Sequence, residues 1–322
     1  MLYPLKFNSI LKEKIWGGHK LHFKSNTDIP GKKIGESWEV SGIKHETSIV
    51  ENGKLQGKNL QELLAEFKED LVGKSVFQRF KNEFPILIKF IEARENLSVQ
   101  VHPDDQLAKK RHKSFGKTEM WYVVENEDDA RIIIDFKTSI TIDAYEELLN
   151  QDALESALNT VKVKEGDSFF IKPGLVHAIG AGVLLAEIQQ TSDITYRLYD
   201  WNRTDIDGNS RELHTDLALE AIDFSGNSDY KIRYNPKLNS KVTLADTPYF
   251  VTNFIEIKGF IDLDYSEMDS FVILMNVGTS AVFIIYKSMS YQLFPKETIL
   301  IPACLQKISL ESEGSKLLEI SI

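Results

Sequence analysis

Cysteine is almost absent from this chain of 322 residues, and the single Cys304 excludes an internal disulfide. The chain also lacks any run approaching the roughly 18 apolar residues of a membrane span. Residues 1–7 lack the continuous apolar core of a secretory signal. Lys and Arg are fewer than Asp and Glu, which gives a net charge of −10, and only residues 109–113 form a basic run. Together these absences predict a cytoplasmic protein that binds neither nucleic acid nor a membrane.

What is present is a series of short apolar segments, which predicts a mainly β protein. We expect strand-like pieces within 1–50 and strands at 84–91, 97–102, 121–124, 130–134, 161–163, 168–171, 183–190 and 195–201. The strands at 121–124 and 130–134 flank a polar turn and are expected to pair as a hairpin. Helical spacing near 58–84 and near 140–158 predicts two helical insertions. Further helices are expected after Asp104 and at 213–222.

The segment that leads to His177 has the order of a cupin. A strand, an acidic glycine turn and a second strand at 168–171 come before Pro173 and Gly174, and His177 follows directly. This order is typical of a cupin-type β-barrel, or jelly roll.

Four side chains form a candidate metal site at the mouth of this barrel. Gln100 and His102 are two residues apart on a strand, so both point to one face, and a proline directly after His102 ends the strand. Glu119 and His177 would complete a mixed nitrogen and oxygen set, which suits zinc or a similar ion. The spacing of Gln100 and His102 alone is more typical of a solvated strand face or a hydrogen-bonded pair.

The last part of the chain contains a faint copy of the first barrel. Residues 271–276 parallel 121–126, and residues 293–302 parallel 163–173. In these alignments Asp269 and Gln306 stand where the candidate carboxylate and second histidine stand, and no Gln-x-His comes before them.

We therefore predict two domains. Residues 1–234 are expected to form the catalytic metal-binding cupin domain with its helical insertions. Residues 235–322 are expected to form a second, degenerate cupin-like β-barrel without a metal site.

Motifs of one known family occur in order along most of the chain, at residues 3–7, 16–18, 35–41, 97–105, 116–122 and 195–201. Together they resemble the type I mannose-6-phosphate isomerases, in the short bacterial form. The resemblance implies zinc-dependent interconversion of mannose 6-phosphate and fructose 6-phosphate through an enediol, with one zinc ion per chain. A sugar phosphate is then the expected small-molecule partner, and we expect a monomer or a homodimer.

By motif position, the resemblance implies that the zinc ligands are Gln100, His102, Glu119 and His177. It implies catalytic roles for Arg197, Lys117 and Glu187. We also expect substrate contacts from Ser98, Trp16 and Arg203, although a tryptophan such as Trp16 is more typical of the core or of a pocket wall. The remaining histidines are expected to take no part, namely His19, His22, His45, His112 and His214.

The reaction itself requires such groups. Moving a hydrogen between C1 and C2 needs a base near the carbon and positive charge where the oxygens become negative. Zinc as a Lewis acid and Arg197 as a permanent cation supply that charge. The base stays open among Lys117, Glu187 and a metal-bound hydroxide.

Two other functions also stay open. One is a cupin-type isomerase of another sugar or sugar phosphate, and the other is a non-catalytic, metal-dependent sugar-binding protein. The presence of both Arg197 and Lys117 favours an enzyme over a binding protein.

Overall fold

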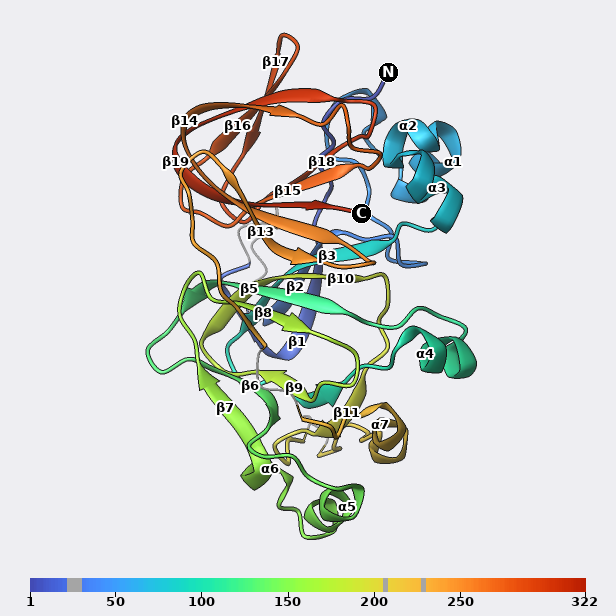
Figure 1. The fold of residues 1–322 in the computed structure, drawn as a ribbon, viewed down its shortest axis with the longest axis vertical. Helices are drawn as coiled ribbons and strands as arrows, with labels where there is room; N and C mark the ends of the chain where they lie inside the picture. Colours follow the sequence, from blue (N-terminus) through green and yellow to red (C-terminus); the bar gives the residue numbers. More distant parts are fainter. Residues whose placement is uncertain (22–30, 205–207, 227–229) are drawn as a thin grey trace. The chain divides into compact units, whose positions relative to one another are not determined.

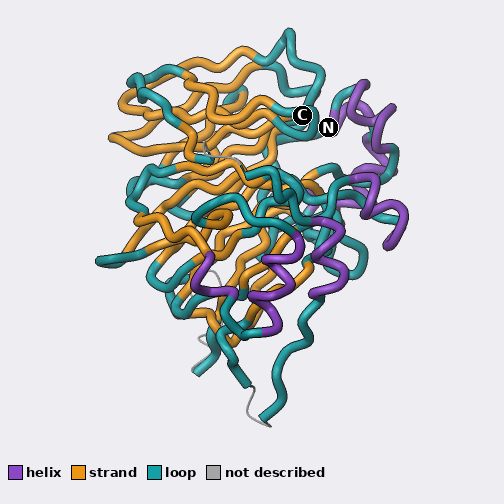
Figure 2. The backbone as a smooth tube through the Cα atoms, turned by 60° about the horizontal axis from the view of Figure 1, so that its bottom comes forward, coloured by secondary structure: helices purple, strands orange, loops and turns teal. Residues whose placement is uncertain are grey.

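The structure is a computed structural model that describes residues 1–21, 31–204, 208–226 and 230–322 (Figure 1). The chain divides into two compact units. One unit comprises residues 11–37 and 90–232, and the other comprises residues 1–10, 38–89 and 233–322. Figure 2 shows much more strand than helix, and the helices are short, which confirms the prediction of a mainly β protein.

Two sheets form the framework around the candidate site. The seven-stranded sheet has the order β1 (Ile10–Gly18), β2 (Ile34–Val40), β3 (Ile86–Ala93), β10 (Val183–Gln190), β5 (Glu119–Asn126), β8 (Ser168–Ile171) and β12 (Lys231–Ile232). The five-stranded sheet has the order β11 (Tyr196–Tyr199), β4 (Val99–Val101), β9 (His177–Ile179), β6 (Arg131–Phe136) and β7 (Leu158–Lys162). The expected cupin architecture is therefore present as two separate sheets and not as one closed ring of strands.

A buried apolar core joins the facing sides of these two sheets. Trp121, Phe169 and Leu185 come from the seven-stranded sheet, and Ile132 and Ile179 come from the five-stranded sheet. Because both sheets bury one face in this core, polar side chains that point inward must find partners. The candidate site residues do point inward.

Helices cover the opposite face of the five-stranded sheet. They are α4 (Asp105–His112), α5 (Ile142–Asn150), α6 (Leu154–Ala157) and α7 (Thr215–Ala221). Val101 and Leu198 of the sheet share a core cluster with Tyr145, Leu154 and Ala218 of the helices. The predicted start of α4 is confirmed, since the Asp104 side chain accepts from Leu107 N at 2.8 Å and caps the helix.

The strands predicted at 121–124 and 130–134 are confirmed, but the predicted hairpin between them is wrong. β5 pairs with β10 and β8, whereas β6 pairs with β9 and β7 in the other sheet. The turn between them carries the chain from one sheet to the other. Both strands are buried on both faces over most of their length, so their sequences give no alternation that would identify a partner strand.

The other unit contains a third sheet, which is antiparallel. Its strands are β13 (Lys241–Asp246), β14 (Val251–Asp264), β15 (Val272–Asn276), β16 (Val282–Tyr286), β17 (Met289–Leu293), β18 (Thr298–Ile301) and β19 (Lys307–Ser321). The order is β13-β14-β19-β15-β18, and β16 pairs with β17 and β19. The start of the chain belongs to this unit, because Leu5 and Leu300 exchange two backbone hydrogen bonds of 2.8 Å.

The helical insertion near 58–84 is present as a short 3-10 turn, η2 (Gly53–Leu55), followed by α1 (Leu60–Phe67), α2 (Glu69–Val72) and α3 (Lys74–Phe80). Gly73 connects α2 and α3 with a φ of 93°. A Cβ at Gly73 would lie 2.3 Å from Asp269 O, so only glycine fits there. The Asp269 carboxylate accepts from the backbone amides of Lys74 and Ser75 at 2.6 and 2.8 Å. Asp269 therefore anchors a helix start.

The strand pairing of the third sheet refines the alignment of the internal copy. Asn276 N donates to Glu297 O at 2.9 Å, in the way that Val123 N donates to Asp167 O at 2.8 Å. Asn276 therefore corresponds to Val123, which shifts the sequence alignment by three residues. In this register, an apolar residue, Val272, occupies the position that corresponds to the candidate carboxylate.

The two units do not follow sequence order. Residues 1–10 and 38–89 belong with the C-terminal strands, whereas the predicted first domain spans residues 1–234. The roles assigned to the predicted domains stay predictions. None of the described helices is long and apolar enough to cross a membrane. His22 lies outside the described residues.

Candidate metal centre

The alternation of β4 places two candidate ligands on the inner side of the five-stranded sheet. Val99 and Val101 pack on the helix-covered side, in the cluster that contains Tyr145. Gln100 and His102 therefore point to the other side. His102 follows the last residue of β4 and is 1% exposed, so it lies at a strand end, as the proline after it predicts.

Strand register brings the other candidates to the same place. In the five-stranded sheet, Gln100 lies directly opposite His177 of β9 on one side and opposite Arg197 of β11 on the other. In the seven-stranded sheet, Glu119 lies opposite Gln189 of β10. Directly opposed residues of antiparallel strands point to the same face. Two rows of polar side chains thus meet across the interior.

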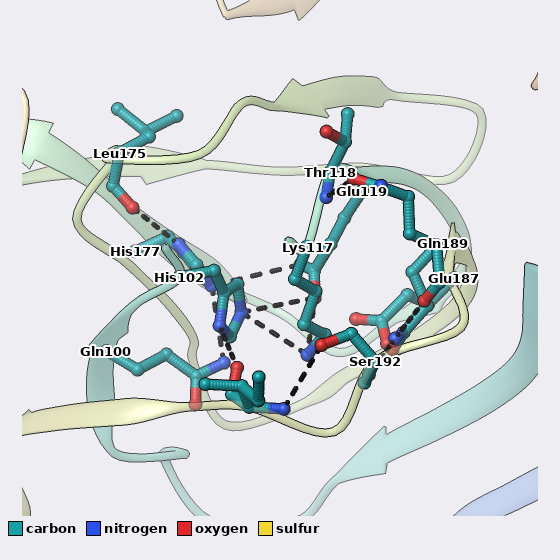
Figure 3. A network of polar contacts seen from close by, with 12 residues as sticks. Gln100, His102, Lys117, Thr118, Glu119, Leu175, His177, Glu187, Gln189 and Ser192 are labelled. Carbon is teal, nitrogen blue, oxygen red and sulfur yellow. Dashed lines mark hydrogen bonds and ion pairs between the residues drawn. The ribbon is translucent and has the colours of Figure 1, made fainter. Parts of the chain in front are cut away.

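Figure 3 shows three of these side chains converging on one point. The ligand atoms of His102, Glu119 and His177 all lie within 4.8 Å of one another, and the three residues are buried. His102 Nε2 is 3.2 Å from Glu119 Oε1, and His177 Nε2 is 3.8 Å from Glu119 Oε2. Two imidazoles and one carboxylate at this spacing are a donor set that a divalent metal ion accepts.

The outer nitrogens of both imidazoles fix the tautomers. His102 Nδ1 lies 3.0 Å from Ile194 O, and His177 Nδ1 lies 2.8 Å from Leu175 O. A carbonyl oxygen only accepts, so each Nδ1 carries the proton and each Nε2 turns a lone pair toward Glu119. Burial, followed by the charge of Lys117, lowers the pKa of His102 to about 3, and burial also lowers the pKa of His177. Both rings are therefore neutral at pH 7, and the short contact of His102 with Glu119 is not an ion pair.

Neutral imidazoles around a carboxylate fit a bound cation. Burial alone would raise the pKa of Glu119, but the positive charge of Lys117 lowers it well below its usual range. Glu119 Oε1 is a buried atom without a hydrogen bond in the described structure. Three buried lone-pair groups that face one another repel unless positive charge lies between them. The residues present thus fit a metal ion.

Lys117 provides positive charge at the same point. Its Nζ lies 2.7 Å from Glu119 Oε1 and 3.3 Å from His102 Nε2, and the side chain is buried. The contact with Glu119 has the distance of an ion pair but not the angles of a hydrogen bond. Lys117 therefore contacts two candidate ligands directly.

Trp121 connects the cluster to Glu187. Its indole Nε1 donates to Glu119 Oε2 at 3.1 Å and to Glu187 Oε2 at 3.0 Å. Its ring also meets the ring of His177 edge-on, with centroids 5.3 Å apart. One N–H group thus holds two buried carboxylates in place, as a second-layer partner of a metal ligand does.

The Gln100 amide and the Arg197 guanidinium lie beside the cluster. Gln100 Nε2 is 3.3 Å from His177 Nε2. Rotation of the amide by 180° would turn its oxygen, the atom that binds metals, toward the same point. Arg197 Nη1 donates to Glu212 O at 2.6 Å, and its buried Nε has no hydrogen bond in the described structure.

The three predicted substrate contacts have different surroundings. Ser98 is buried next to β4, and Trp16 belongs to the apolar core at 4% exposure. Arg203 donates to Asn96 O at 2.6 Å and to the carboxylate of Asp200. Arg203 therefore has protein partners, and the substrate-binding role of all three residues stays a prediction.

Sequence reasoning did not anticipate several neighbours of the site. His214 was expected to take no part. Its ring Nδ1 accepts from the backbone amide of Arg197 at 3.1 Å, and its backbone amide donates to Arg197 O at 2.7 Å. Gln189 donates through Nε2 to Ser192 O at 2.6 Å, which fixes a loop beside Lys117. No spacing in the sequence indicates the His214 contact. Gln189 could have been suggested by its place in an apolar strand, two residues after Glu187, because that spacing puts both side chains on one face.

The fold and this cluster define a cupin-like protein with a buried His-Glu-His site of the kind that binds metals. Comparison with known proteins agrees. Residues 4–142 match the family model described as phosphomannose isomerase type I, catalytic domain. The chain is 36% identical to mannose-6-phosphate isomerase ManA of Bacillus subtilis over 263 residues, which cover 81% of each chain. It is 34% identical to the mannose-6-phosphate isomerase of Streptococcus mutans, over 82% of each chain.

A solved structure shows the same relationship over the full length. The crystal structure of the mannose 6-phosphate isomerase from Bacillus subtilis superimposes with a TM-score of 0.88 at 30% identity and covers 100% of both chains. This chain belongs to the type I mannose-6-phosphate isomerase family.

Proposed function

We propose that this protein is a zinc-dependent isomerase that interconverts mannose 6-phosphate and fructose 6-phosphate through an enediol. The observation that carries the proposal is the convergence of His102, His177 and Glu119 on one point, with Lys117 in contact with two of them. Membership of the family supports this substrate, because the relatives that match over 81% and 82% of their length are named mannose-6-phosphate isomerases.

The proposed cofactor is one zinc ion per chain, held by His102, Glu119 and His177, with Gln100 as the fourth ligand. Two neutral imidazoles and a carboxylate are ligands that zinc favours in catalytic sites. A zinc ion bound there would supply Lewis acidity to the C1 and C2 oxygens of the sugar.

The side chains around the cluster account for the proton transfers. In the aldose-to-ketose direction, a proton leaves C2 and one is added at C1, while a hydroxyl proton moves from O2 to O1. Glu187, held by Trp121, is the proposed base at carbon, since a carboxylate can accept the proton. Lys117, whose Nζ lies 2.7 Å from Glu119 Oε1, is the proposed proton donor at oxygen. Arg197 adds a cation that does not lose its proton.

A coupled assay of fructose 6-phosphate formation tests the whole proposal. It is run on the protein as purified, after chelation and after zinc is restored. Activity that falls on chelation and returns with zinc is expected. A folded, zinc-loaded protein without turnover would contradict the proposal, and a panel of other sugars and sugar phosphates would then be needed.

Two variants test the assignment of the base. Glu187→Gln is expected to lower kcat by about 10²-fold to 10⁴-fold, as loss of a general base does, while zinc content stays unchanged. Normal turnover in this variant would transfer the role to Lys117, and Lys117→Met would then show the larger loss.

We further propose that the enzyme works in the cytoplasm as a monomer or a homodimer. The single cysteine, Cys304, supports a reducing compartment. Light scattering coupled to size-exclusion chromatography measures the assembly state, and a tetramer or larger assembly would contradict this expectation.

A further inference from the structure

A second concave site lies on the other side of the strand that carries Arg197. It is a cleft of about 550 Å³ between α5, α6, α7 and β11. Its apolar wall is made of leucines from all four elements and the segment before α7, namely Leu148, Leu149, Leu154, Leu198, Leu213 and Leu219. Leu198 follows Arg197 along β11, so the two side chains point to opposite faces of the sheet. The cleft is therefore separate from the metal cluster.

Tyr145, one of the residues that line this cleft, carries a buried hydroxyl without a partner among the described residues. The Tyr145 side chain is 0% exposed, and its ring packs edge-on against Phe136 and Phe224. Its hydroxyl has no hydrogen bond in the part of the chain that the structure describes. Because buried hydroxyl groups are almost always hydrogen-bonded, an unpaired hydroxyl on a residue that lines a cleft is suited to a ligand. Burial raises the pKa of Tyr145, so the hydroxyl stays protonated and can donate as well as accept.

The charges around the cleft have one sign. Glu146, Asp152 and Asp216 line it, and none of the described lining residues is Lys, Arg or His. Asp152 accepts from the neutral Asn202 Nδ2 at 3.4 Å, and no ion pair compensates its charge within the described part of the chain. An apolar wall with carboxylates around it favours a ligand with an apolar body and a positive charge.

We propose that this cleft is a binding site for a small organic cation, an ammonium group carried on an apolar or aromatic body. The apolar part lies against the leucines, the ammonium group faces Asp152, Asp216 and Glu146, and the Tyr145 hydroxyl pairs with a polar atom of the ligand. This site goes beyond the proposed isomerisation, and its test does not depend on zinc or on turnover.

The test compares three probes of the same shape and different charge by isothermal titration calorimetry at low salt. 2-Phenylethylammonium is expected to bind one-to-one with a Kd of about 1 mM or lower, which is reasonable for a ligand of this size. 2-Phenylethanol is expected to bind at least about 5-fold more weakly, and 3-phenylpropanoate more weakly still. Added salt is expected to weaken the ammonium compound selectively.

Variants assign the binding to the cleft. The double variant Asp152→Asn with Asp216→Asn is expected to weaken 2-phenylethylammonium about 5-fold or more. Tyr145→Phe is expected to weaken it about 3-fold to 10-fold, while the melting temperature of the free protein stays equal or rises, because an unpaired buried hydroxyl is removed. Asp128→Asn is the matched control, since it removes an exposed acidic charge that does not line the cleft.

Three results would overturn the proposal. They are absence of saturable binding by 2-phenylethylammonium at 10-fold above the expected Kd of about 1 mM, equal affinity for the neutral alcohol, and a loss in Asp128→Asn as large as that in the double variant. Unchanged binding in Tyr145→Phe would refute the assignment of the hydroxyl as a ligand contact.

Discussion

Replacing Trp121 with phenylalanine tests whether the network around the cluster supports metal binding. The indole N–H donates to Glu119 and to Glu187 at 3.1 and 3.0 Å, and phenylalanine keeps an aromatic ring beside His177 but has no donor. Both buried carboxylates would then lose a donor, and Glu119 would be held less firmly toward the imidazoles. The variant therefore changes the orientation of a ligand without removing any ligand.

The size of the effect follows from the two hydrogen bonds. A hydrogen bond to a charged group contributes about 1.5–3 kcal/mol, and one shared N–H is expected to contribute about as much as one such bond. Converted at about 1.4 kcal/mol per factor of ten, this corresponds to about 10-fold to 150-fold. We expect zinc affinity to fall by about 10-fold to 100-fold, as loss of a second-layer partner does.

Competition with a chromophoric zinc chelator measures this change. Trp201→Phe is the control, because the Trp201 indole donates to the backbone oxygen of Leu97 at 2.7 Å and not to a carboxylate. The control is expected to lose stability but to keep its zinc affinity. A zinc affinity of Trp121→Phe within about 2-fold of the unmutated protein, well below the range expected for such a partner, would refute the reasoning.

Three further predictions concern charged groups. Arg197→Lys is expected to lower kcat by about 10²-fold to 10³-fold with zinc content unchanged, because lysine cannot replace the fixed guanidinium. Steady-state kinetics measures kcat and metal analysis measures the zinc content. A normal kcat would contradict this prediction. Glu319 is 1% exposed, accepts a hydrogen bond from Tyr265 and pairs with Lys241 at 2.6 Å. Glu319→Gln is therefore expected to lower the free energy of unfolding in urea by about 2–4 kcal/mol and to leave kcat unchanged. An unaltered free energy of unfolding would contradict this prediction. Hydrogen bonds, first from Lys172, lower the pKa of Asp223 to about 2, below the usual 3.8. Its contribution to stability is therefore present above about pH 4 and lost toward pH 2, so the melting-temperature advantage over Asp223→Asn should shrink over that range, and a constant difference would exclude it.

The sequence predicted the site better than the strand pairing, for a physical reason. Gln100 and His102 alternate with Val99 and Val101, and a strand separates such residues onto two faces, which the structure shows. The hairpin between β5 and β6 was predicted from chain neighbourhood and a polar turn, and it is wrong because the strands enter different sheets. Which strands pair depends on how distant segments pack, and strands that are buried on both faces have no alternation of polar and apolar residues that would identify a partner strand.

Contacts that depend on tertiary structure were also beyond the sequence. The backbone of Arg197 is held by His214, 17 residues further along the chain, and no periodicity connects the two positions. The copy of the barrel was visible in the sequence, but its register was not, because Asn276 resembles Asn126 in type while its backbone bonds match those of Val123. Matching the two asparagines placed the alignment of the copy three residues out of register, and the backbone hydrogen bonds give the correct register.

Metal analysis of the purified protein, combined with zinc-edge X-ray absorption, tests the central claim most directly. The account predicts one zinc ion per chain, with two imidazole nitrogens at about 2.0–2.1 Å and oxygen ligands completing the shell. It also predicts that His177→Ala loses both the metal and the isomerase activity. Stoichiometric zinc that is retained in a folded His177→Ala, or a sulfur ligand in the shell, would contradict the assignment of the site to His102, Glu119 and His177.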